Sequence, residues 1–253
     1  MGTIYWNGIP SSSVSVVVEE PPSYHAAERD YEMTHIPGRS GDFLIDNGSY
    51  RNVTRSYKIA FGSIRKTHSE MASAVSEWLH SANGYTRLED TYEPEYYRLA
   101  IYKDDVNLTN ILNHLGRATI DFDCMPQRFL KSGERPITFS ISPFDSYGRF
   151  TLKNPTSFKS KPLIIVTGRS AGSLVINGLN LAINMTPPEH EVYYSITIDS
   201  DLCEVYNGQV SYNSFISWPN RDRTFPVLNP GENDIYFSGG IGTVEVIPRW
   251  WTL

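Results

Sequence analysis

The sequence predicts a mainly β protein of two domains: an N-terminal β domain with one α-helix and a long arm, and a C-terminal β-sandwich. Three observations lead to this prediction. Short runs that alternate apolar and polar residues recur along most of the chain, as half-buried strands do. Aromatic residues, which suit pleated surfaces, make up 13% of the 253 residues. The 18 glycines and 16 prolines are spread between the runs as turn formers.

Four segments of the first half have the composition of strands, since each is short and either alternates or is apolar throughout. They are VSVVVEE (14–20), RSYKIAF (55–61), EYYRLAIY (95–102) and ATIDFDC (118–124).

One helix is predicted over residues 67–84, THSEMASAVSEWLHSANG. Thr67 and Glu70 have the spacing of a capping box at its start, and Gly84 suits a left-handed stop at its end. Apolar side chains recur along it at helical intervals, at Met71, Val75, Trp78, Leu79 and Ala82. We expect this stripe to pack on a sheet rather than to bind a partner.

The segment from Ser23 to Tyr50 is long, polar and marked by Gly and Pro, and it has few core residues before Thr34. A segment this extended within a compact domain is usually functional. Two outcomes are open: it folds back on its own domain, or it reaches a neighbouring subunit as an arm.

A run of prolines and turn formers after Cys124 predicts a domain boundary near residue 135. Short strand-like segments follow at regular spacing: 162–168, 172–178, 179–185, 193–201, 203–208, 233–239 and 242–248. Asn177 and Gly178 stand between two apolar runs, which is a strong hairpin signal. This succession favours a sandwich or jelly roll.

Charge and cysteine content limit the function classes. The formal net charge is -6 and no Lys/Arg cluster is present, so nucleic-acid binding is not expected. Cys124 and Cys203 are far apart in strand-like segments, and we predict a pair of buried, reduced thiols. The N-terminus lacks a signal-peptide pattern and the chain has no run of 18 apolar residues, so membrane insertion is not expected either.

No motif predicts catalysis or a metal site: HExxH, CxxC and Gly-x-Ser-x-Gly are all missing. Asp121 and Asp123 have a spacing that a glycosidase pair would tolerate, but nothing nearby would separate their pKa values, and a solvated strand face is preferred. Asp199 and Asp201 lack the further ligands of a calcium loop. We therefore expect no enzyme, cofactor or metal.

The glycines of YFSGGIGTVEVIP (236–248) raise the question of a phosphate-binding loop. Such a loop leads into a helix N-terminus, whereas TVEVIP alternates like a strand. Gly239, Gly240 and Gly242 are therefore predicted to form a turn or bulge between strands.

Four parts of the chain, in order and spacing, resemble the distal tail proteins (Dit) of siphophages, and the length and two-domain layout resemble those of Dit from Bacillus siphophages. They are HIPGRSGDFLIDNGSYRNVTRSYKIAF (35–61), IDFDCMPQRFLKSGE (120–134), the hairpin and strand GRSAGSLVINGLNLAI (168–183) with YYSITIDSDLCEVY (193–206), and LNPGENDIYFSGGIGTVEVIPRWWTL (228–253).

The resemblance implies a structural virion protein rather than an enzyme. Dit subunits form a homohexameric ring at the distal end of the tail, and DNA passes through its channel. For this chain the resemblance implies a ring-forming tail-hub domain over residues 1–135 and a galectin-like β-sandwich over residues 136–253. It also implies assembly in the host cytoplasm.

The partners implied are the other copies in the ring, the major tail tube protein, the tail fibre or tip protein and the tape measure protein. In some phages the C-terminal domain also holds a receptor-binding protein. The polar arm would be a belt that embraces the next subunit, and its candidate contact residues are Tyr24, His25, Arg29, Tyr31, Arg39 and Asp42.

An alternative function is a carbohydrate-binding module for attachment to the host surface. Trp218, Asn220 and Arg221 lie close in sequence and are the candidate glycan or partner contacts. A galectin groove also uses His side chains, and none accompanies these three.

Overall fold

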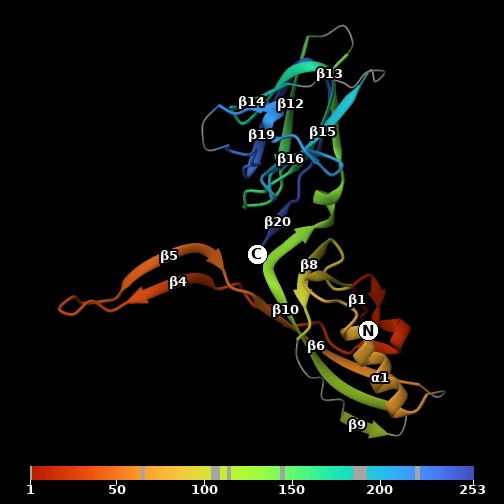
Figure 1. Cartoon of the computed structure of the whole chain (residues 1–253). Coiled ribbons are helices and arrows are strands. Elements are labelled where there is room, and N and C mark those ends of the chain that lie inside the picture. Colours follow the sequence, from red (N-terminus) through yellow and green to blue (C-terminus); the bar gives the residue numbers. More distant parts are fainter. Residues whose placement is uncertain are drawn as a thin grey trace. The chain divides into compact units, whose positions relative to one another are not determined.

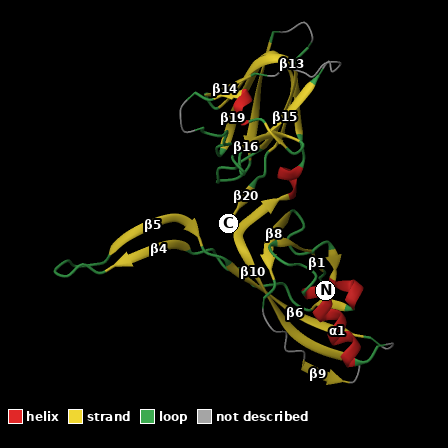
Figure 2. Ribbon diagram, in the orientation of Figure 1, coloured by secondary structure: helices red, strands yellow, loops and turns green. Residues whose placement is uncertain are grey.

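The computed structural model describes residues 2–63, 66–103, 109–112, 115–142, 146–184, 193–219 and 223–253. The chain divides into two compact units, Met1–Arg128 with Leu253, and Phe129–Thr252. Strands dominate both units, and the α-helix found in the described part of the chain is α1 (His68–Leu79) (Figures 1 and 2). The predicted mainly β fold with one helix is confirmed.

The first unit is built on a sheet in which β6 (Val53–Gly62) and β10 (Leu115–Leu130) form a long antiparallel pair. The path through the sheet is β2 (Ile9–Pro10), β1 (Ile4–Trp6), β7 (Thr86–Asp90), β8 (Tyr96–Ile101), β10, β6 and β3 (Val16–Val18), with β9 (Thr109–Leu112) also on β10. A short 3-10 helix, η1 (Ser11–Val14), precedes β3. Alternate residues of β6 are buried, as the sequence pattern predicts.

Helix α1 packs its apolar stripe into the core of this unit. Met71, Val75, Trp78 and Leu79 are buried together with side chains of the strands. Within the same core the rings of Trp6 and Phe122 lie 4.8 Å apart. The stripe is therefore a core contact, as expected.

The start of the helix is confirmed and its predicted end is wrong. Thr67 and Glu70 form the capping box in both directions. The helix stops at Leu79 rather than at Gly84, and side chains of the N-terminal segment bond to carbonyls at its end and just beyond it. The indole N–H of Trp6 donates to the Leu79 carbonyl at 3.0 Å, and the Asn7 amide donates to that of Ser81 at 3.1 Å.

The polar segment between β3 and β6 is a β-hairpin, not an irregular loop. Its strands are β4 (Arg29–Thr34) and β5 (Phe43–Tyr50), which pair only with each other and form a separate sheet. The strands are hard to recognise in the sequence because neither face of the hairpin is covered by its own chain. Neither face therefore requires a regular row of apolar residues.

The second unit is a β-sandwich whose long strands β13 (Leu163–Ile176) and β19 (Gly231–Ile247) pair along most of their length. The path through the sheet is β11 (Ile137–Ser140), β19, β13, β15 (Tyr194–Asp199), β16 (Glu204–Asn207) and β17 (Val210–Ser211). Also paired are β12 (Tyr147–Asn154) with β19, β14 (Leu179–Ile183) with β13, and β18 (Ile216–Ser217) with β14. The remaining elements are η2 (Lys131–Glu134), η3 (Asn213–Phe215) and β20 (Trp251–Thr252).

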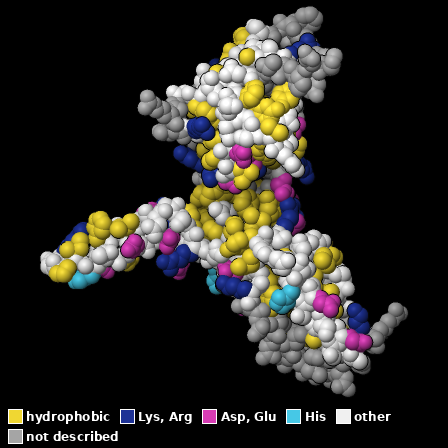
Figure 3. All heavy atoms as spheres, viewed as in Figure 1, with side chains coloured by type: hydrophobic (Ala, Val, Ile, Leu, Met, Phe, Trp, Pro, Cys, Tyr) yellow, Lys and Arg dark blue, Asp and Glu magenta, His cyan; other side chains and the backbone are white. Residues whose placement is uncertain are grey.

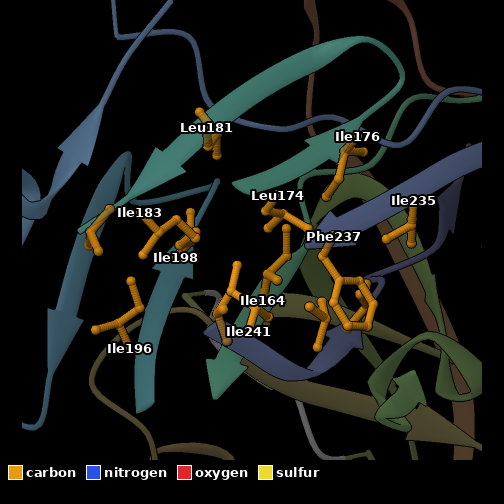
Figure 4. Close-up of a cluster of buried hydrophobic side chains, with 14 of the residues drawn as sticks. Ile164, Leu174, Ile176, Leu181, Ile183, Ile196, Ile198, Ile235, Phe237 and Ile241 are labelled. Carbon is orange, nitrogen blue, oxygen red and sulfur yellow. The ribbon is translucent and has the colours of Figure 1, made fainter. Parts of the chain in front are cut away.

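The core of this unit is almost wholly aliphatic. Side chains of β13, β14, β15 and β19 point toward one another, among them Ile164, Leu181, Ile198 and Phe237 (Figure 4). The hairpin between β13 and β14 turns at Asn177 and Gly178, whose φ angles of 50° and 84° are those of the predicted turn.

The glycine-rich stretch is a bulge and not a turn, because β19 continues through it as one strand. The register between β13 and β19 shifts between Gly168 and Gly172, opposite Gly239 and Ile241. Gly239 has a φ of 74°, and a Cβ there would lie 2.9 Å from the Cα of Gly172. Glycine thus lets two bent strands approach closely at this point.

The cysteine prediction holds for one residue of the two. Cys124 is fully buried on β10, and burial raises the pKa of its thiol to about 12. Cys203 is exposed, since it lies in the turn between β15 and β16 with a φ of 54°. Both cysteines are free.

Candidate functional site

The hairpin of β4 and β5 is the most exposed ordered element of the first unit. Every residue from Tyr31 to Ser49 is exposed. Six of them are large and apolar: Tyr31 (40% exposed), Met33 (65%), Ile36 (40%), Phe43 (45%), Leu44 (49%) and Ile45 (41%). Figure 3 shows hydrophobic side chains gathered along it. A patch of this kind on a soluble protein marks an interaction surface.

The register of the hairpin distributes these side chains over both faces. Met33 pairs with Leu44, and Tyr31 pairs with Asp46, so these residues share one face. The other face carries Glu32 opposite Ile45, and Thr34 opposite Phe43. A partner could therefore bury either face or clasp both.

Ion pairs hold the base of the hairpin in shape. Arg29 donates to both carboxylate oxygens of Asp46, the shortest contact being 2.7 Å, and to the hydroxyl of Tyr50 at 2.9 Å. The hydrogen bond from Arg29 holds the pKa of Asp46 below its ordinary value. Asp30 likewise pairs with Arg51 at 3.1 Å.

The predicted contact residues occupy different parts of the arm. Arg29 forms the ion pair with Asp46 at the base of the hairpin, and Tyr31 is exposed on β4. At the tip, the guanidinium of Arg39 lies 5.8 Å from the ring centre of Phe43, and Asp42 lies 3.3 Å from Nδ1 of His35. Tyr24 and His25 are exposed in the root segment that precedes β4.

The root of the arm is attached to a buried ionic network around Arg55. Arg55 is 3% exposed and donates to Asp90 at 3.1 Å and to Glu93 at 2.8 Å. Its guanidinium lies 4.6 Å from the ring centre of Tyr24 and donates to the carbonyl of Ser23 at 3.4 Å. Tyr57 donates to Asp90 at 2.6 Å. The network thus anchors the root to the core.

Sequence reasoning missed this network, although a signal was present. In RSYKIAF, Arg55 occupies the same alternate positions as the buried Tyr57, Ile59 and Phe61. A charged residue in the buried register of a strand must find ionic partners, because an unpaired buried charge is costly. Burial raises the pKa of Tyr57 well above its usual range, and the charge of Asp90 raises it further, so the hydroxyl remains a donor.

A groove of about 400 Å³ lies beside the network. Arg128 lines it and is fully engaged: it donates to Glu93 at 2.7 Å and to the main-chain oxygen of Leu253 at 2.5 and 3.0 Å. Arg98 of β8 also lines it. The remaining lining residues are Tyr24, His25, Ala26, Ala27 and Leu253.

In the second unit, one of the three predicted glycan or partner contacts, Trp218, lies within the described residues. The ring of Trp218 packs on Phe225 at 4.6 Å and against the core, and its indole N–H is buried without a partner among the described residues. Asn220 and Arg221 lie outside the described residues.

Asp199 has a structural role. Its carboxylate accepts two hydrogen bonds from Arg249, at 2.7 and 2.8 Å, and two from the backbone N–H groups of Asp201 and Leu202. Over the described ranges, no group of three or more acidic, His or Cys side chains could hold a metal ion. The same residues contain no helix long and apolar enough to cross a membrane.

Comparison with known proteins identifies the fold. No protein-family model and no curated protein sequence matches the chain. Among solved structures, the crystal structure of SPP1 Dit (gp 19.1), described as "a Paradigm of Hub Adsorption Apparatus in Gram-positive Infecting Phages", is similar with a TM-score of 0.71. The match covers 100% of both chains at 12% sequence identity. The predicted likeness to siphophage distal tail proteins is thereby confirmed at the level of the fold.

Proposed function

We propose that this chain is a structural hub protein of a siphophage tail. Six copies form a ring at the distal tip of the tail, join the tail tube to the adsorption apparatus and leave a central channel for DNA. The support is the full-length similarity to SPP1 Dit, which is itself described as a hub of an adsorption apparatus. Residues 1–135 build the ring, and residues 136–253 form a peripheral galectin-like domain.

The observation that carries the proposal is the exposed hairpin of β4 and β5. Fully burying one large apolar side chain contributes about 1.5–3 kcal/mol, so covering six half-exposed ones would contribute several kcal/mol to an assembly. In an isolated monomer, a hairpin that exposes such side chains to water on both faces would be unfavourable and prone to aggregation. In a ring, each hairpin would lie on the next subunit.

The proposed partners follow from the place of a hub in the tail. One side of the ring meets the major tail tube protein, the other side meets the tail fibre or tip protein, and the tape measure protein reaches the ring. The second unit is the attachment point for a receptor-binding protein. The net charge of -6 suits a channel that DNA passes without being held. The role is non-catalytic, and assembly takes place in the host cytoplasm before the protein is part of the virion.

Light scattering after size exclusion tests the proposal on the 28.7 kDa chain over a range of concentrations. A mass near six subunits, which falls to that of one subunit when residues 31–49 are replaced by a two-residue turn, supports the ring. A monomer at every concentration, also when the tube and tip proteins are co-expressed, overturns it. A glycan array then tests the alternative, a carbohydrate-binding module, with Trp218→Ala as the variant that should lose binding.

A further inference from the structure

Arg98 is a nearly buried guanidinium for which the described residues provide no hydrogen-bond acceptor. Its side chain is 12% exposed, and its one ion pair within the described residues is to Glu93, at 3.7 Å. That distance is too long for a hydrogen bond. A guanidinium carries five N–H donors, and leaving them unpaired in a partly desolvated site is unfavourable.

The neighbouring carboxylates are already bound to other donors, and the nearer of them, Glu93, is not within hydrogen-bond distance of Arg98. Glu93 accepts from Arg55 at 2.8 Å with one oxygen and from Arg128 at 2.7 Å with the other. Asp90 accepts from Arg55 and Tyr57 with one oxygen, and from two backbone N–H groups with the other. Three arginines thus share two carboxylates, and Arg98 is the one left over.

The free side of Arg98 faces the groove of about 400 Å³. Apart from the guanidiniums and His25, the groove is lined by Tyr24, Ala26, Ala27 and Leu253, so it offers apolar walls around a positive group. Burial lowers the pKa of Arg98, and the charges of Arg55 and Arg128 lower it further, which together outweigh the opposite effect of Glu93. Such a site favours a carboxylate, which a guanidinium binds through two parallel hydrogen bonds.

Among the described residues of the hairpin, one carboxylate has no ionic partner and could bind a guanidinium of another copy. Asp30, Asp42 and Asp46 each have an ionic partner within the hairpin or beside it. Glu32 is exposed on β4 and has no partner in the described parts of the chain. It shares its face with the apolar side chains of Phe43 and Ile45, which match the apolar walls of the groove.

We propose that the groove at Arg98 is the receiving site for the hairpin of a second copy, with the Glu32 carboxylate of that copy bound by Arg98. The inference rests on the proposed ring and adds the site that the arm occupies. It also selects the face of the hairpin that is buried against the groove, namely the one that carries Glu32, Phe43 and Ile45.

A disulfide between two copies tests this arrangement. Both chains carry Cys203→Ser, one carries Glu32→Cys, the other carries Ala26→Cys, and the two are co-expressed with different tags. Since Cys124 is buried, a disulfide that joins the two tags links position 32 of one copy to position 26 of another. Met33→Cys is the matched control, because residue 33 lies on the opposite face of the same strand. We expect a disulfide-linked mixed dimer when the first chain carries Glu32→Cys, and none when it carries Met33→Cys instead.

A second variant measures the ion pair itself. Glu32→Gln should raise the protein concentration needed for half-assembly about tenfold or more, because Arg98 then loses its charged acceptor. This inference would be overturned if rings of normal mass formed but Glu32→Cys gave no mixed dimer, or if Met33→Cys gave as much mixed dimer as Glu32→Cys. The proposed function would then still stand. A chain that never assembles would contradict both the proposed ring and the proposed receiving site.

Discussion

The carboxylate of Glu93 and the guanidinium of Arg55 lie 2.8 Å apart, and both side chains are almost completely buried. Arg55 comes from the sheet that carries the core, and the same guanidinium contacts Tyr24 and Ser23 at the root of the arm. One side chain thus connects the stability of the first unit to the position from which the hairpin leaves it. Removing that side chain should affect both properties.

Arg55→Leu should lower the free energy of unfolding by about 3–5 kcal/mol, because it leaves Asp90 and Glu93 buried without their main counter-charge. Urea unfolding followed by tryptophan fluorescence measures the loss. The matched control is Lys58→Met on the same strand, where Lys58 and its partner Glu20 are 60% and 59% exposed. That exposed pair should contribute less than about 1 kcal/mol. Equal effects of the two substitutions would show that the buried network is not what stabilises the unit.

Ile45→Asp should prevent assembly without affecting folding, because residue 45 is 41% exposed and lies on the face of the hairpin that the next subunit would cover. A charge there would have to be buried in the subunit contact, at a cost of several kcal/mol. Light scattering gives the mass, and thermal unfolding confirms the fold. Leu202→Asp is the control, since Leu202 is 66% exposed in the second unit. If Ile45→Asp and Leu202→Asp form rings equally well, the hairpin is not the assembly element.

Much of this fold could be predicted from local sequence because local rules agree with the tertiary structure. The capping box at Thr67 and the Asn177–Gly178 turn depend on neighbouring residues alone, and both occur as expected. The end of α1 could not be predicted from local sequence, because the carbonyl of Leu79 accepts from the indole of Trp6, 73 residues away in sequence, and not from the N–H of a further helical turn.

The candidate site was less predictable than the fold. Strand β5 lacks the apolar alternation of a half-buried strand, since neither of its faces is buried within the chain. The network joins Arg55 of β6, Asp90 of β7 and Arg128 of β10 to Glu93, which lies between β7 and β8. Spacing in the sequence therefore does not reveal it. Only the position of Arg55 in the buried register of β6 indicated that partners must exist.

Gly240→Ala should destabilise the second unit by about 1–3 kcal/mol through overpacking. A Cβ at Gly240 would lie 2.5 Å from the backbone oxygen of Ser170, so the paired strands would have to separate. The matched control is Gly242→Ala, where a Cβ would meet nothing within 4 Å. Thermal unfolding of the two variants compares them directly. A Gly242→Ala variant that is as unstable as Gly240→Ala would mean that backbone freedom, and not the close approach of β13, explains these glycines.

Acid should weaken the second unit through Asp199, whose side chain is 3% exposed and bound by Arg249. Burial by itself would raise the pKa of Asp199, but hydrogen bonds from Arg249 and from two backbone N–H groups outweigh it and hold the pKa below the ordinary value of 3.8. A carboxyl whose pKa is lower in the folded state binds its proton more readily when unfolded. Its contribution to stability is therefore complete above pH 3.8 and is lost as the pH falls through the lowered value.

Arg249→Gln should reverse this balance, because burial of Asp199 remains while its counter-charge is gone. We expect the pKa of the Asp199 carboxyl to rise, and the unit to lose about 1–3 kcal/mol at neutral pH. Titration of the carboxyl carbon by NMR measures the pKa, and urea unfolding at several pH values measures the stability. Lys161→Gln is the control, since Lys161 and Asp201 form an exposed pair nearby, 58% and 62% exposed. An Asp199 pKa that stays low in Arg249→Gln would assign the stabilisation to the backbone N–H groups of the turn instead of to the arginine.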